Sequence, residues 1–174
     1  MVYRELIAHL GQGKGIAINT IAELLSQTFD CLLLVHPQIQ VLEKTSSEIQ
    51  GLGFAHLNVS KGLSSSLMTV SASARSRITQ EWLMDSMAAF QNGPVLCTNP
   101  DLLFDPSLEI DPLALFRQAA RIIPLIVMWP GEYLTHILSY AVPEHHHYRT
   151  WKISDPLLQH PAVIIQRIST SPGA

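Results

Sequence analysis

Lys44 and Thr45 are the first residues whose type and position suggest chemistry. They follow an apolar segment, residues 30–35, at about the distance that separates a buried strand from the Lys-Ser/Thr pair of a phosphate loop. Such a loop needs glycines before the lysine, because its backbone amides must approach the phosphates closely. No glycine lies between residues 32 and 50, and larger side chains stand there instead: His36, Pro37, Ile39, Val41 and Leu42. The residues alone therefore favour a solvated helix start over a phosphate loop.

A nucleotide-dependent enzyme also needs an acidic residue near the tip of a second strand, where it holds Mg²⁺. The predicted strand over residues 95–98 ends at Thr98, and the nearest acids, Asp101 and Asp105, come slightly later. If Mg-ATP binds, Thr45, Asp101 and Asp105 are the candidate metal ligands, and Asp101 is the candidate catalytic residue that orients metal or water. Both aspartates can equally cap a turn or the next helix.

Arg149 is a third candidate for nucleotide binding, because a cation near the carboxyl edge of a sheet can contact a phosphate. A structural ion pair is the competing interpretation. Three adjacent histidines, His145 to His147, do not have the spacing of a zinc site, and we predict a surface loop there. No nucleophile stands out, since the serines lack a Gly-x-Ser-x-Gly elbow and neither cysteine has a recognisable histidine partner.

The elements that must position these residues are clearest between residues 94 and 131. Residues 95–98 and 122–129 are unbroken apolar runs, which are typical of strands covered on both faces. Between them, Asp111 can cap a helix whose first residue is Pro112. That helix has one buried stripe, formed by Leu113, Phe116 and Ala120. Strand, helix and strand at this spacing predict a right-handed crossover between parallel strands.

The rest of the chain repeats this alternation. Further strands are predicted over residues 30–35, 54–59, 133–142, 149–153 and 162–168, and helices over residues 16–27, 45–50 and 75–90. The Ser- and Ala-rich residues 60–74 are expected to form a loop or a mobile helix start. We predict one α/β domain over residues 1–174 with a mainly parallel sheet, an N-terminal arm over residues 1–15 and a flexible tail over residues 169–174. Ligands of such sheets bind beyond the carboxyl ends of the strands.

Composition excludes several classes of protein. Of the 174 residues, 47% are apolar and 14% are charged, which argues against disorder and indicates a surface partly covered by a partner. The net charge of −3 gives no electrostatic footprint for nucleic acid. No apolar run is long enough to cross a bilayer, and residues 1–10 do not resemble a signal peptide. Cys31 and Cys97 lie in predicted strands, so we expect buried, reduced thiols and a cytoplasmic protein.

Four stretches resemble the BrxF family, the small P-loop proteins of type 3 BREX anti-phage defence systems. They are LLFDPSLEIDPLALF at residues 102–116, IVMWPGEY at 126–133, SYAVP at 139–143 and HYR at 147–149. The resemblance covers roughly residues 94–151 and is weaker over residues 30–60. It implies a three-layer P-loop NTPase-like sandwich. It also aligns Lys44 and Thr45 with the family's phosphate loop, Thr98 with its first acidic position and Asp101 with a second one.

Two departures from that family decide the functional expectation. The glycines before Lys44 are missing, and Thr98 stands where the family has an acid. We therefore expect a degenerate P-loop domain that binds no cofactor and acts as an assembly or regulatory subunit in bacterial anti-phage defence. Its expected partners are other defence proteins or further copies of itself. The alternatives are an active Mg-dependent ATPase of the same system, which would use ATP and Mg²⁺, and a nucleic-acid adaptor.

Overall fold

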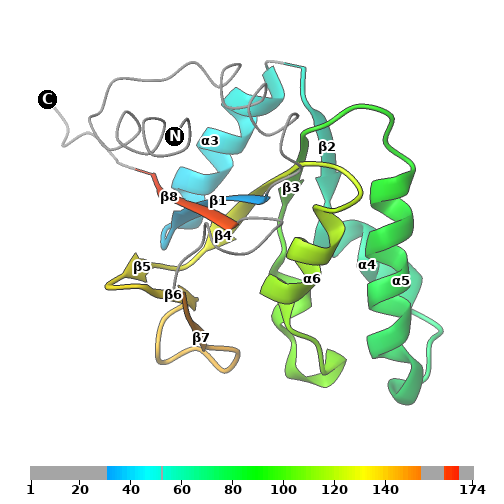
Figure 1. Cartoon of the computed structure of the whole chain (residues 1–174). Helices are drawn as coiled ribbons and strands as arrows, with labels where there is room; N and C mark the ends of the chain where they lie inside the picture. Colours follow the sequence, from blue (N-terminus) through cyan, green and yellow to red (C-terminus); the bar gives the residue numbers. More distant parts are fainter. Residues whose placement is uncertain (1–30, 52, 154–162, 169–174) are drawn as a thin grey trace, which may run out of the picture.

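A five-stranded parallel sheet is the framework of the fold. The computed structural model describes residues 31–51, 53–153 and 163–168. The strands are β1 (Cys31–His36), β2 (Ala55–Asn58), β3 (Val95–Thr98), β4 (Leu125–Pro130) and β8 (Val163–Arg167). Their order is β2-β3-β4-β1-β8, and every neighbouring pair is parallel (Figure 1). The mainly parallel α/β sheet predicted from the sequence is confirmed.

Helices cover both faces of this sheet, because successive strand residues point to opposite sides. One face carries α3 (Ile39–Gly51), and the other carries α4 (Val59–Leu67), α5 (Arg75–Ala88) and α6 (Pro112–Ala119) (Figure 1). The core on the α3 side contains Leu32, Leu42, Ile49, Leu96, Ile126, Met128 and Ile164. The larger core on the other side includes Leu33, Leu63, Met87, Cys97, Phe116 and Val127. This arrangement is compatible with a three-layer sandwich.

The crossover from β3 to β4 follows the local signals in the sequence. Asp111 Oδ1 accepts hydrogen bonds from the backbone N–H groups of Leu113 at 3.0 Å and Ala114 at 3.2 Å, and Pro112 opens α6. Two short 3-10 helices precede it, η2 (Asp101–Phe104) and η3 (Pro106–Leu108). Strand β4 begins at Leu125 rather than at residue 122, because the chain first turns, with the N–H of Ile122 bonded to the carbonyl of Ala119 at 2.9 Å.

Residues 60–74 differ most from the prediction, because most of them are helical. Helix α4 occupies Val59–Leu67, and the short 3-10 helix η1 occupies Ala72–Ala74. Asn58 caps α4 by accepting a hydrogen bond from the N–H of Lys61 at 3.0 Å. Helix α3 likewise begins earlier than predicted, at Ile39 instead of after Thr45.

A second, antiparallel sheet replaces the single strand predicted over residues 133–142. It consists of β5 (Tyr133–Leu134), β6 (Ile137–Tyr140) and β7 (Arg149–Lys152), and it projects beside the main sheet (Figure 1). Thr135 and His136 both have positive φ, which is the geometry of a two-residue hairpin turn. An aromatic cluster packs this sheet against the larger core; its members are Phe104, Trp129, Tyr140 and Trp151.

Three further predictions concern the ends of the chain, the thiols and membranes. The helix predicted over residues 16–27, the arm over 1–15 and the tail over 169–174 lie outside the described residues. Both cysteines are buried as predicted, and burial raises the pKa of the Cys97 thiol to about 12. None of the helices in the described part of the chain combines the length and the apolar character that a bilayer crossing requires.

Candidate functional site

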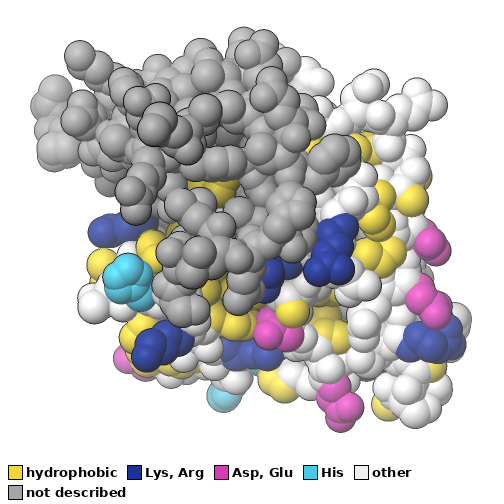
Figure 2. Space-filling view, viewed as in Figure 1, with side chains coloured by type: hydrophobic (Ala, Val, Ile, Leu, Met, Phe, Trp, Pro, Cys, Tyr) yellow, Lys and Arg dark blue, Asp and Glu magenta, His cyan; other side chains and the backbone are white. Residues whose placement is uncertain are grey.

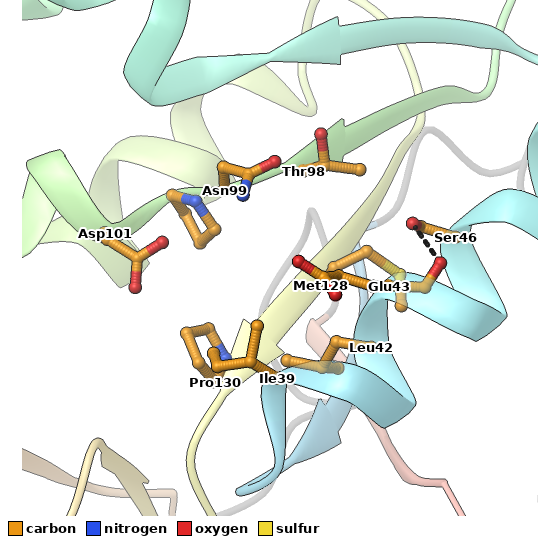
Figure 3. A pocket seen from close by; sticks show the side chains of 10 residues that line it. Ile39, Leu42, Glu43, Ser46, Thr98, Asn99, Asp101, Met128 and Pro130 are labelled. Carbon is orange, nitrogen blue, oxygen red and sulfur yellow. Dashed lines mark hydrogen bonds between the residues drawn. The ribbon is translucent and has the colours of Figure 1, made fainter.

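A pocket opens where the chain leaves the sheet in opposite directions. After β1 the chain passes to α3 on one face, and after β3 it passes to η2 and α6 on the other, with β4 between the two strands. Ligands of open α/β sheets bind at such a switch point. The pocket lies between α3 and the ends of β3 and β4 (Figure 3). Its lining residues are Ile39, Leu42, Glu43, Ser46, Thr98, Asn99, Pro100, Asp101, Met128 and Pro130.

The cavity is small, at about 50 Å³. A single water molecule needs roughly 10–15 Å³ by the same measure, so the space suits a few waters or one small functional group. A nucleoside triphosphate does not fit into it as it stands. The candidate site is therefore a recess for a single group, and any larger ligand would extend into solvent.

One face of α3 forms the first wall of the pocket. Four lining residues of this helix are spaced by three, one and three positions, which brings them to the same side: Ile39, Leu42, Glu43 and Ser46. The hydroxyl of Ser46 donates to the backbone carbonyl of Glu43 at 2.9 Å. The side chain of Glu43 lines the cavity (Figure 3). Two of the predicted nucleotide ligands sit elsewhere on this helix: Lys44 is exposed, Thr45 is half-buried, and neither lines the pocket.

The connection from β1 to α3 explains the position of Lys44. Only Pro37 and Gln38 separate the end of β1 at His36 from the helix start at Ile39. The ring Nδ1 of His36 accepts a hydrogen bond from the N–H of Gln38 at 3.0 Å, which fixes this short turn. Lys44 is therefore in the second helical turn, about 7–8 Å along the axis from the first residue. The extended glycine-rich loop of a phosphate site has no counterpart between this strand and this helix.

The end of β3 forms the second wall and carries a polar network that the sequence did not reveal. Thr98 is buried, and its hydroxyl shares a hydrogen bond of 2.8 Å with Nε2 of His56 from β2. Asn99 has a φ of +51°, in the left-handed region that asparagine tolerates better than most residues. Its carbonyl accepts hydrogen bonds from the hydroxyl of Ser60 at 2.6 Å and the N–H of Ser60 at 3.0 Å, and its side chain bonds Asn58 at 3.2 Å.

This network ties β2, β3 and α4 together beneath the pocket. Partial burial lowers the pKa of His56, so the neutral imidazole is favoured beside Thr98. The sequence signal that could have identified His56 is that a polar residue stands in a predicted buried strand. The hydroxyl that His56 meets depends on the register of β2 and β3, in which His56 pairs with Leu96 and Asn58 pairs with Thr98. This register is set by the tertiary structure and is not visible in the local sequence.

Asp101 is the predicted site residue that lines the pocket. It begins η2, is exposed, and its Oδ1 accepts a hydrogen bond from the hydroxyl of Tyr140 at 3.1 Å. Burial, together with the neighbouring Asp101 charge, raises the pKa of Tyr140. The phenol thus stays protonated and donates to the carboxylate. Tyr140 belongs to β6, so the second sheet reaches the pocket through this bond.

The remaining predicted residues lie away from the pocket. Asp105 accepts a hydrogen bond from the N–H of Ser107 at 2.8 Å and caps η3, and this bond holds its pKa below the usual value. Arg149 donates to the carbonyl of Ile110 at 2.9 Å and lies 5.3 Å from the centre of the Trp151 ring. Neither residue lines the cavity. The nucleotide and metal roles of these residues stay predictions.

The histidine run forms the predicted surface turn between β6 and β7. His145 accepts a hydrogen bond from the N–H of His147 at 3.1 Å, and the two rings lie 5.4 Å apart. Among the described residues, no three His, Cys, Asp or Glu side chains are grouped closely enough to hold a metal ion.

The charge of the pocket comes from its two acids. Glu43 and Asp101 contribute carboxylates, and no lysine or arginine of the described part of the chain is among the lining residues. The other walls are mainly apolar, from Ile39, Leu42, Met128 and the two prolines. The arrangement can bind a small cationic or hydrogen-bond-donating group, and its described lining residues include no lysine or arginine side chain that could hold a phosphate.

Comparison with known proteins adds no relative. Neither family models, nor curated proteins, nor solved structures yield a match to this chain. The resemblance to the BrxF family therefore stays a prediction from the sequence.

Proposed function

We propose that this chain is a phosphate-loop-like α/β domain that has lost nucleotide binding and acts as an assembly or regulatory subunit. Its setting would be bacterial anti-phage defence, as the resemblance to the BrxF family implies. The loss of nucleotide chemistry is supported by the structure around the candidate site. The setting rests on the four resembling stretches of sequence.

The observation that carries the proposal is the two-residue connection between β1 and α3. A phosphate loop wraps successive backbone N–H groups around the phosphates and ends in a lysine at the helix start. Here the helix has already made more than one turn before Lys44. The residues that would have to form the anion nest, from Ile39 to Glu43, are helical instead, and the side chains of Ile39, Leu42 and Glu43 line the pocket.

An assembly role is supported by the apolar surface of the second sheet. Leu134 and Ile137, which are paired across the hairpin, are 50% and 47% exposed, and Val142 beyond the hairpin is 51% exposed. The exposed pair of Leu134 and Ile137 lies on a projecting element, and exposed apolar patches mark sites that other proteins cover.

Calorimetric titration with ATP and Mg²⁺ tests the proposal directly. We expect no binding at micromolar to millimolar ATP, either for the wild type or for Lys44→Ala. Lys61→Ala is the matched control, because Lys61 is also an exposed helical lysine and lies on α4, away from the pocket. Micromolar binding that disappears in Lys44→Ala and persists in Lys61→Ala would overturn the loss of nucleotide binding.

The ATPase alternative is favoured by one observation, the place of Asp101 in the pocket. In that alternative Lys44 contacts the terminal phosphates, Thr45 ligates Mg²⁺ and Asp101 orients metal or water. Phosphate release above background that Asp101→Asn abolishes would establish it. The nucleic-acid alternative has less support: the described basic side chains on the face drawn in Figure 2 are scattered among acidic and apolar ones. Salt-sensitive retention on heparin would revive it.

A further inference from the structure

We propose that the pocket between α3 and the end of β3 binds an organic cation, an ammonium or guanidinium group on a short aliphatic stem. The proposal concerns the pocket alone and does not depend on the defence setting. It rests on three properties of the cavity: its paired carboxylates, its apolar walls and its size.

The two carboxylates come from opposite walls. Glu43 extends from the second turn of α3, and Asp101 starts η2 after β3 (Figure 3). No described cation neutralises either one: the only ion pair among the described residues joins Arg77 to Glu81 on α5. Tyr140 donates one hydrogen bond to Oδ1 of Asp101. The second carboxylate oxygen of Asp101 is left to accept a hydrogen bond from a ligand. A donor with several N–H groups placed between the walls would satisfy both acids.

The apolar walls select an organic cation over a bare metal ion. Ile39, Leu42 and Met128 offer carbon surface along which a methylene stem can lie, as the stems of lysine and arginine do in proteins. Mg²⁺ demands about six oxygen ligands in octahedral geometry and gives up its water reluctantly. A Mg²⁺ ion held by these two carboxylates would keep most of its shell as water and would leave the apolar walls without a ligand, whereas an alkyl stem covers them.

The same charges disfavour an anion. The start of α3 supplies about half a positive charge at most, and this effect fades within the first turn of a helix. Two carboxylates outweigh it. A phosphate in the pocket would therefore be repelled, whereas an ammonium group would be attracted. The cavity volume of about 50 Å³ admits a head group of that size and leaves the rest of the molecule outside.

An NMR titration of the full chain tests this inference, with butylammonium and butylguanidinium as the probes. Butanol and butyrate have the same stem without the positive charge. We expect saturable shifts of the amide signals of residues 39–46, Thr98, Asn99 and Asp101 with the two cations only. Because Glu43 and Asp101 are both exposed, solvent and salt screen them, and we expect millimolar affinity that weakens as salt is added.

Variants decide whether the carboxylates are responsible. Glu43→Gln and Asp101→Asn each keep the side-chain shape and should weaken binding roughly threefold to fivefold, as for an exposed ion pair. The double variant should bind butylammonium no better than butanol. Glu48→Gln is the matched control, since Glu48 is an exposed acid of α3 outside the pocket, and it should bind like the wild type. Unchanged amide spectra and urea midpoints would show that the variants are folded.

Three results would overturn the proposal: equal binding of butanol, unchanged cation binding in the double variant, or the same shifts with Mg²⁺ at lower concentration. Two further probes distinguish the sources of the cation. Tighter binding of 1,4-diaminobutane would support the proposal with a free amine as ligand, and tighter binding of N-acetyl-lysine amide would support it with a side chain of a protein partner. ATP titration is independent of these results, so failure of the cation site and failure of the proposed function can be told apart.

Discussion

The indole of Trp129 joins the two sheets, and its replacement by phenylalanine tests how they are held together. Trp129 is fully buried in β4, and its Nε1 donates to the carbonyl of Ser139 in β6 at 2.8 Å. Its ring meets the rings of Phe104 and Trp151 edge-on, with centroids 5.0 and 5.3 Å away. Trp129→Phe keeps an aromatic ring at this position but removes the N–H group and part of the indole.

The expected loss of stability follows from these contacts. An unpaired buried acceptor costs about 1–3 kcal/mol. Ser139 is only 9% exposed, and a water that replaced the indole N–H would need two or more polar partners in a cluster that is otherwise aromatic. The lost part of the ring leaves a space that adds roughly 1–2 kcal/mol. We therefore expect the variant to be about 3 kcal/mol less stable than the wild type.

Urea unfolding followed by far-ultraviolet circular dichroism measures this loss. With a denaturant slope of about 2 kcal/mol per molar, the unfolding midpoint should fall by about 1.5 M. Trp151→Phe is the control, because Trp151 Nε1 donates at 3.1 Å to the carboxylate of Asp111, which keeps its bonds from the N–H groups of α6. That variant should lose about 1 kcal/mol or less. Equal losses in the two variants, or a shift below about 0.5 M for Trp129→Phe, would refute the reasoning.

Two further predictions concern a glycine and an acid. A Cβ at Gly131 would collide with the backbone carbonyl oxygen of Ser139, so Gly131→Ala should lower the free energy of unfolding by about 3 kcal/mol or more in the same urea assay. Gly51→Ala is the control: a Cβ there meets nothing within 4 Å, and stability should change by less than about 1 kcal/mol. The pKa of Asp105 is lower in the folded state than in the unfolded state, where it is about 3.9. The ionised carboxylate therefore stabilises the folded state fully above the pKa of the unfolded state, and this stabilisation is lost as the pH falls through the pKa of the folded state. The advantage of the wild type over Asp105→Asn at pH 7 should therefore shrink at pH 3, and an equal difference at both pH values would contradict this.

Local chemistry made much of the fold predictable. Strand β3 and the start of α6 lie where the apolar run and the Asp111-Pro112 pair placed them, because both signals are contained in a few neighbouring residues. Helix α4 was missed, since its serines suggest a loop. In the structure the hydroxyls of Ser64 and Ser65 donate to the backbone of the preceding turn, and Gly62 lets Trp82 pack closely against α4. Tertiary packing therefore overrides a weak local preference.

The candidate site was less predictable, because its walls come from segments that meet only through the order of the strands. The insertion of β4 between β1 and β3 places Met128 beside α3 and leaves Asp101 across the cavity from Glu43. Nothing near Glu43 in the sequence identifies it as a pocket residue. Asp101 was identified because it comes soon after a predicted strand end at Thr98, and the rule that ligands bind beyond such ends holds for any parallel sheet.

Three of the four stretches on which the predicted BrxF resemblance rests have a shared physical role in this chain. They supply Phe104, Trp129 and Tyr140, three of the four rings in the cluster that packs the second sheet against the core. Tyr140 stacks on Phe104 with ring centroids 3.6 Å apart, and its hydroxyl holds the carboxylate of Asp101. Any shift of β6 must therefore either move this carboxylate or break its bond. The second sheet is in this sense part of the candidate site, because it sets the direction of one of the two charges that face the pocket.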